Sequence, residues 1–69
     1  MKPNKEPLAV GQEVKYYDVL IATVKPVQST VTEIAEDGIP SCDEPMCRLK
    51  DKRGYVLQSH CFPLEWAPS

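Results

Sequence analysis

The residues best suited to chemistry are gathered in one short stretch near the end of the chain. Residues 54–66, GYVLQSHCFPLEW, hold the single histidine, the single tryptophan and one of the three cysteines. The adjacent His60 and Cys61 bring together an imidazole and a thiol, the groups that a cysteine nucleophile or a zinc site needs. The elements around this pair decide whether those groups do chemistry or build the fold.

Zinc is the first chemistry to weigh, because its sites in proteins are built from thiolates and imidazoles. The chain offers four such groups, Cys42, Cys47, His60 and Cys61. Side chains of the adjacent His60 and Cys61 would diverge on a strand, and Cys47 lies in an alternating segment where a small buried hydrophobe is expected. We therefore expect structural cysteines, no metal and no cofactor, and keep these four residues as the alternative zinc set.

Catalysis by the His60-Cys61 pair is a second hypothesis. Sequence neighbours rarely present a thiolate and an imidazole in hydrogen-bond geometry, and no third group is placed to orient the base. An odd number of cysteines in a chain without a secretion signal also argues against a disulfide framework. The sequence predicts reduced thiols and a protein that is not an enzyme.

Size and charge limit the remaining functions. The chain has 69 residues and a net charge of −2, which fits one small domain with no general attraction to nucleic acid or anionic membranes. No segment has the apolar core of a signal peptide or the roughly 18 apolar residues of a membrane span. We expect a cytoplasmic protein without a membrane partner.

Short strands must position these residues. Residues 1–10 carry two prolines before any periodic pattern and are predicted to be a tail, and the fold is expected to start near Gly11. Residues 12–17 alternate as a half-buried strand with Val14 and Tyr16 inward. The apolar run 19–24 fits either a buried strand or a packed loop, and 27–34 reads as a second strand with a bulge near Thr32, because apolar residues fall on both faces.

The second half of the chain predicts a loop and a hairpin. Residues 36–45 contain turn signals and prolines and are expected to be irregular. Cys47 and Leu49 should point inward on the next strand, residues 51–54 should close a hairpin, and residues 55–58 should form its partner strand. The fold class is therefore all-β, a small antiparallel barrel of about five strands, occupying residues 11–66 and followed by a tail at 67–69.

These residues resemble an SH3-like barrel. The resemblance rests on Gly11-x-x-Val14-x-Tyr16 as a first strand, Gly54-Tyr55-Val56 as a fourth strand, residues 59–62 as a single 3₁₀ turn, and Leu64-Glu65 as a closing strand. The first strand is also similar to that of the Tudor-like and KOW-like varieties of this superfold. The resemblance implies a fold that hosts many functions, so it names no activity by itself.

Aromatic and basic side chains supply the candidate binding residues. Tyr17 should point outward if Tyr16 points inward, and a surface patch of aromatic rings with a titratable imidazole is predicted from Tyr17, Tyr55, His60 and Trp66. The cations of the hairpin sequence RLKDKR form the only basic cluster, which consists of Arg48, Lys50, Lys52 and Arg53. The acidic loop at residues 36–44 would form an opposite pole.

Three functions follow from this arrangement. The first is a non-enzymatic protein-binding module, self-associating through its two poles in one version, of the kind found among accessory proteins of phages and mobile elements. The second is a nucleotide or nucleic-acid binder that uses the basic hairpin and a stacking tyrosine. The third is a minimal enzyme with a site assembled between subunits. We expect a protein partner, with a homo-oligomer and a nucleic-acid ligand as alternatives.

Overall fold

Five short strands and one 3₁₀ turn make up the fold. In the computed structural model, which describes residues 1–67, the elements are β1 (Glu13–Tyr16), β2 (Val27–Ala35), β3 (Met46–Leu49), β4 (Tyr55–Leu57), η1 (Gln58–His60) and β5 (Cys61–Pro63). The strands form one antiparallel sheet in the order β4-β3-β2-β1-β5, which confirms the all-β prediction. Within residues 1–67 no ladder joins β4 to β5, so the predicted barrel is open and η1 bridges its two edge strands.

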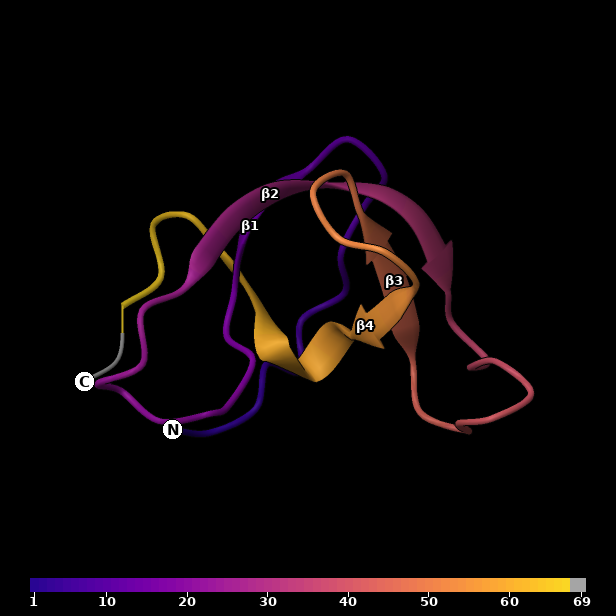
Figure 1. The fold of residues 1–69 in the computed structure, drawn as a ribbon, viewed down its shortest axis with the longest axis horizontal. Helices are drawn as coiled ribbons and strands as arrows, with labels where there is room; N and C mark the ends of the chain where they lie inside the picture. Colours follow the sequence, from indigo (N-terminus) through magenta and orange to yellow (C-terminus); the bar gives the residue numbers. More distant parts are fainter. Residues whose placement is uncertain (68–69) are drawn as a thin grey trace.

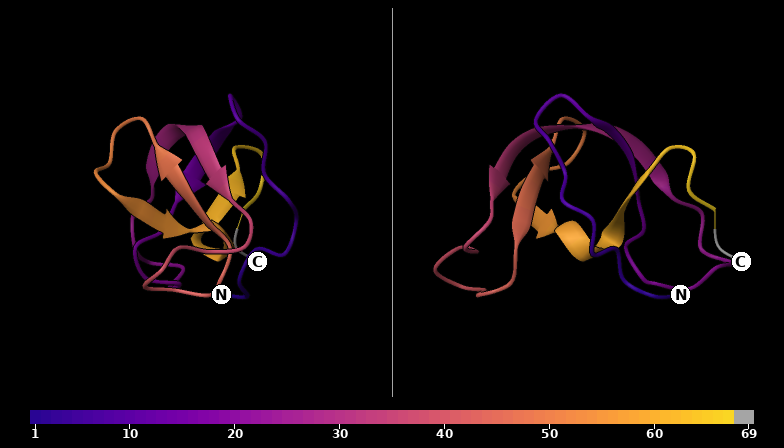
Figure 2. Two further views of the ribbon diagram at one scale, coloured as in Figure 1. Left: turned by 90° about the vertical axis from the view of Figure 1, so that its right-hand side faces the viewer. Right: turned by 180° about the vertical axis from the view of Figure 1, so that it is seen from behind.

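The long strand β2 holds the two halves of the sheet together. Its first half pairs with β1 and its second half with β3, and it arches over the molecule opposite η1 (Figures 1 and 2). The register shifts between Val31 and Glu33, which confirms the bulge predicted near Thr32. Because an extra residue reverses the alternation, Val31 points into the core before the bulge and Ile34 packs against the core after it.

A small apolar core fills the space under β2. It follows the predicted alternation, with Val14 and Tyr16 inward on β1 and Cys47 and Leu49 inward on β3. The buried cluster consists of Leu8, Val14, Tyr16, Val31, Cys47, Leu49, Val56 and Cys61. Leu8 comes from the predicted tail, so the packed fold extends N-terminal to Gly11.

The last turn and the last strand lie at earlier positions in the chain than the sequence indicates. η1 begins at Gln58, one position before the predicted turn, and the closing strand is residues 61–63 where the prediction placed it at Leu64. Leu64 is half-buried, and the buried residues of this strand are Cys61 and Phe62. Apart from Ala67, the predicted tail 67–69 lies outside the described residues.

The apolar run at residues 19–24 forms a loop. No ladder includes it, and the side chains of Val19 and Ile21 are 47% and 50% exposed, so the buried-strand alternative is wrong. Lys25-Pro26 ends the run just before β2 begins, since proline removes a backbone donor. In the described part of the chain no helix has the length and hydrophobicity needed to span a bilayer.

Candidate functional site

The predicted aromatic surface patch is divided by the fold. Tyr17 is only 3% exposed, so its predicted role as a surface ring is wrong. It does lie on the face opposite Tyr16, but Phe62 and Trp66 cover that face. The Tyr17 and Phe62 rings meet edge to face at 5.6 Å, and Trp66 stacks on Phe62 at 3.9 Å.

His60 is fixed by the backbone beside this cluster. Its Nδ1 lies 2.7 Å from the carbonyl oxygen of Tyr17, and the Tyr17 amide donates to the carbonyl of His60. A carbonyl can only accept, so Nδ1 is the donor in this bond and the ring orientation is fixed. His60 therefore joins η1 to the end of β1, and only part of its surface is free.

Tyr55 lies apart from the other aromatic rings. Its hydroxyl donates to a carboxylate oxygen of Glu33 at 2.6 Å, a bond that raises the pKa of Tyr55, and the guanidinium of Arg48 lies 5.8 Å from the ring centre. Tyr55 is on β4 and Trp66 follows β5, the two edges of the sheet. The fold brings Tyr55 next to the basic residues of the hairpin, away from Trp66.

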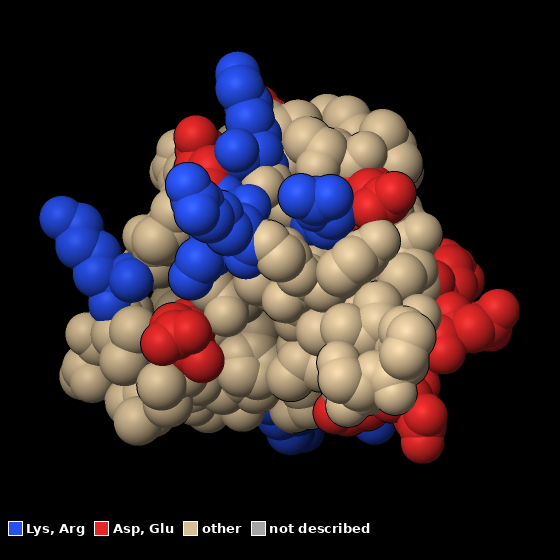
Figure 3. All heavy atoms as spheres, turned by 45° about the vertical axis from the view of Figure 1, so that its right-hand side comes forward, with Lys and Arg blue, Asp and Glu red and all other residues tan. Residues whose placement is uncertain are grey.

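The four predicted basic residues of the hairpin differ in how exposed they are. Arg48, Lys50 and Arg53 are exposed, whereas Lys52 lies with its ammonium 4.7 Å from the centre of the Tyr16 ring. Figure 3 shows basic side chains gathered on one part of the surface and acidic side chains along another. Acidic side chains also lie beside the basic ones in this view.

The four residues of the alternative zinc set do not converge. Cys47 and Cys61 are fully buried with their Sγ atoms 3.8 Å apart, while Cys42 lies in the 36–45 loop and His60 is bonded to Tyr17. The hydrogen bond with Cys47, together with burial, raises the pKa of the Cys61 thiol. No group of three or more His, Cys, Asp or Glu side chains within residues 1–67 is placed to hold a metal ion.

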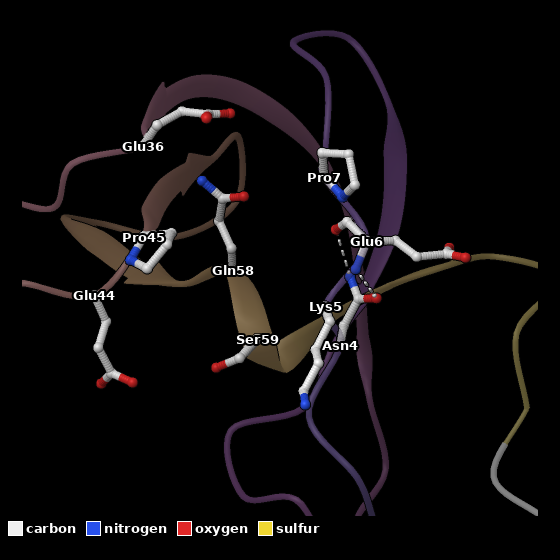
Figure 4. Close-up of a pocket in the computed structure, with 9 residues that line it drawn as sticks. All are labelled: Asn4, Lys5, Glu6, Pro7, Glu36, Glu44, Pro45, Gln58 and Ser59. Carbon is white, nitrogen blue, oxygen red and sulfur yellow. Dashed lines mark hydrogen bonds between the residues drawn. The ribbon is translucent and has the colours of Figure 1, made fainter.

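A groove beside η1 is the strongest candidate site. It has a volume of about 390 Å³ and runs between residues 4–7, which have no regular secondary structure, and the two ends of the 36–45 loop (Figure 4). Gln58 and Ser59 of η1 lie between these two walls. The residues that line it are Asn4, Lys5, Glu6, Pro7, Glu36, Glu44, Pro45, Gln58 and Ser59.

The groove has one acidic wall and one mixed wall. Glu36 and Glu44 stand on the loop side, whereas Lys5 stands on the opposite side and the carboxylate of Glu6 points away from the other residues drawn in Figure 4. Gln58 is 7% exposed, and its side-chain amide donates to the carbonyl of Met46 at 3.0 Å, which fixes η1 against β3. The floor of the groove is therefore rigid and its walls carry hydrogen-bonding and charged groups.

Sequence reasoning missed most of this groove. Its residues come from the predicted tail, the predicted irregular loop and the last turn, none of which has a periodic pattern. The one available signal was composition, since Pro7 and Pro45 each lie beside a polar segment without a strand pattern, and proline interrupts strand pairing. The predicted residues Tyr17, Tyr55, His60 and Trp66 do not line it.

Comparisons of the chain with protein-family models, with curated proteins and with solved structures found no match.

Proposed function

We propose that this protein is a non-enzymatic binding module that holds an extended segment of a partner protein in the groove beside η1. The single observation that carries this proposal is the 390 Å³ groove itself, which has a floor fixed by Gln58 and exposed walls that combine proline rings with charged side chains. Its volume falls within the range of specific small binding sites. The Glu36 and Glu44 wall favours a partner segment with lysine or arginine side chains.

The nucleic-acid alternative would use a different surface. Arg48, Lys50 and Arg53 are exposed there, but the Tyr55 hydroxyl is bonded to Glu33 and the Arg48 guanidinium lies near its ring. A base would have to displace this arrangement before it could stack on Tyr55. These contacts favour the peptide groove over the hairpin as the binding site.

A nuclear magnetic resonance titration tests the proposal. Two peptides of equal length, one with lysine and arginine and one with aspartate and glutamate, are added to the ¹⁵N-labelled protein. The basic peptide should shift the amide signals of Gln58 and Ser59, and the acidic peptide should not. Shifts confined to residues 50–53, or stronger binding of the acidic peptide, would contradict the proposal.

A charge-neutralised double variant tests whether the acidic wall of the groove binds the basic peptide. The double variant Glu36→Gln/Glu44→Gln should weaken binding of the basic peptide by about three- to tenfold, because each exposed charge pair contributes up to about 1 kcal/mol. The matched control, Asp37→Asn/Asp43→Asn, removes two carboxylates of the same loop that do not line the groove. An equal loss of affinity in both double variants would show that the groove is not the site.

A further inference from the structure

Residues 1–7 lie against the strands without forming part of the sheet. They have no regular secondary structure, and Lys2, Pro3, Lys5, Glu6 and Pro7 are exposed. The next residue, Leu8, is 6% exposed and belongs to the core. The segment is therefore attached to the fold at Leu8 and rests on its surface up to that point.

One residue makes most of the polar contacts that hold this segment down. The Asn4 amide donates to the carbonyl of Ser59 at 2.8 Å, and its side-chain Nδ2 donates to the carbonyl of Cys61 at 2.7 Å. Nδ2 also donates to the carbonyl of Glu6, and Oδ1 accepts from the Glu6 amide, so the side chain fixes its own turn. The other bond from the segment to the barrel runs from the amino group of Met1 to the carbonyl of Leu20 at 3.1 Å.

The segment does not fill the surface depression that it crosses. On one side lies the 390 Å³ groove, and on the other lies a hollow of about 600 Å³ lined by Phe62 and Trp66 together with residues 1–6. Asn4, Lys5 and Glu6 line both spaces. Because the segment forms a wall of each space, its departure would join them into one trough that extends from η1 to the stacked rings of Phe62 and Trp66.

The chemistry of the segment matches the trough in two respects. Its Asn4 carboxamide donates to the Cys61 carbonyl at the start of β5. Its Lys5 stands across the groove from the Glu36 and Glu44 wall. Pro3 and Pro7 restrict the chain on either side toward extended geometry, which lowers the entropy lost on docking.

Lifting the segment breaks few interactions. Between residues 1 and 7 no side chain is buried, so opening exposes little apolar surface and breaks the two Asn4 bonds and the Met1 bond. Regions with so few buried contacts open at much lower free energy than the whole domain. Leu8 can remain in the core while residues 1–7 leave the trough.

We infer that the trough is a binding site for an extended, proline-flanked segment with an asparagine and a basic residue, and that residues 1–7 are its resident intramolecular occupant. A partner segment of the same chemistry binds by replacing them. This inference rests on the proposed function, because it names the ligand class and the regulation of the same site. The resident segment lowers the apparent affinity for a partner by the fraction of time that it occupies the trough.

Hydrogen exchange of the unmodified protein tests whether the segment opens. The Asn4 amide, bonded to Ser59, should exchange at least about a hundredfold faster than the Val31 amide, which is bonded to Gln12 in the core of the sheet. Equal protection of the two amides would mean that the segment leaves only on global unfolding. That result would overturn the inference.

A full-chain variant tests the ligand chemistry. Asn4→Asp removes the donor to Cys61, so the resident segment should occupy the trough less, and a synthetic peptide of residues 1–8 should bind about five- to tenfold more tightly than to the unmodified protein. Binding is followed by the amide signals of Ser59 and Cys61 and by Trp66 fluorescence. The same peptide with aspartate in place of asparagine should bind more weakly, and Gln28→Glu, an exposed change of the same charge outside the trough, should leave the affinity unchanged.

The outcomes separate the two proposals. If the lysine and arginine peptide shifts Gln58 and Ser59 but the peptide of residues 1–8 binds both proteins equally or ignores its asparagine, the resident-ligand inference is wrong and the proposed function stands. If neither peptide shifts the trough residues in the Asn4→Asp protein, both are wrong.

Discussion

At the scale of single residues, Tyr16 is a buried tyrosine whose pKa is raised by its surroundings. Its ring is 8% exposed, and its hydroxyl donates to a carboxylate oxygen of Asp18 at 3.2 Å. Burial, followed by the bond to Asp18, raises the pKa of Tyr16 to about 12 from its usual 10.0. The folded protein therefore holds the phenolic proton more tightly than the unfolded chain does.

This shift predicts a loss of stability at alkaline pH. The contribution of Tyr16 is fully present below the unfolded pKa of 10.0 and is lost as pH rises toward the folded pKa of about 12. The free energy of unfolding, measured in urea, should fall less between about pH 9 and about pH 11 for Tyr16→Phe than for the unmodified protein. The lysines titrate in both proteins, so their contribution cancels in this comparison. Asp18→Asn should give an intermediate decrease, because burial of the ring remains. Equal decreases in Tyr16→Phe and the unmodified protein would contradict the prediction.

At the scale of elements, the 36–45 loop carries the acidic wall of the groove on a tight turn. Gly38 has a φ of +85°, and a Cβ there would lie 2.3 Å from the carbonyl oxygen of Cys42. Ile39 and Cys42 exchange two backbone bonds of 2.8 and 2.9 Å just beyond it. This close approach fixes how the loop returns toward Glu44 and Pro45.

Gly38→Ala is therefore expected to destabilise the protein more than a matched glycine substitution. Gly11 has a similar φ of +90° but has open space where its Cβ would lie. Both substitutions carry the left-handed backbone penalty of about 1–2 kcal/mol, and Gly38→Ala adds the steric clash with the loop. Urea unfolding of both variants measures the difference, and a smaller effect for Gly38→Ala than for Gly11→Ala would show that the loop yields freely.

The strands themselves could be predicted from the sequence because their faces differ. Alternation placed Val14, Tyr16, Cys47 and Leu49 correctly, and the conflict of apolar faces in residues 27–34 located the bulge of β2. Periodicity, however, reports only which face a residue occupies. Tyr17 does occupy the opposite face, but residues more than 40 positions away cover it, and no local pattern encodes that contact.

The groove could not be predicted for a related reason. It is formed where three aperiodic segments meet: residues 4–7, the two ends of the 36–45 loop, and η1. Their meeting depends on side chain to backbone bonds between distant residues, such as Asn4 to Cys61 and Gln58 to Met46. An asparagine in a tail shows no pattern that distinguishes a free side chain from one bonded 57 positions away.

At the scale of the whole molecule, two apolar clusters lie on opposite faces of β5. Cys61 points into the inner core, whereas Phe62, the neighbouring residue, packs with Tyr17 and Trp66 on the other face. A chain of this size buries a small fraction of its surface compared with larger domains, so its total stability lies toward the low end of about 5–15 kcal/mol. The outer cluster is therefore expected to contribute a large share of that stability, in addition to forming the floor of the trough.

Phe62→Ala tests the contribution of the outer cluster. Phe62 is 1% exposed, and replacing a buried phenylalanine by alanine costs about 3–5 kcal/mol, which would leave a domain whose stability is about 5 kcal/mol with only about 0–2 kcal/mol. Phe62→Leu keeps most of the apolar volume but loses the ring contacts with Tyr17 and Trp66, and should cost only about 1–2 kcal/mol. Urea unfolding followed by Trp66 fluorescence and by circular dichroism measures both variants. If Phe62→Ala costs no more than Phe62→Leu, the outer cluster contributes little to stability and the inner core alone stabilises the fold.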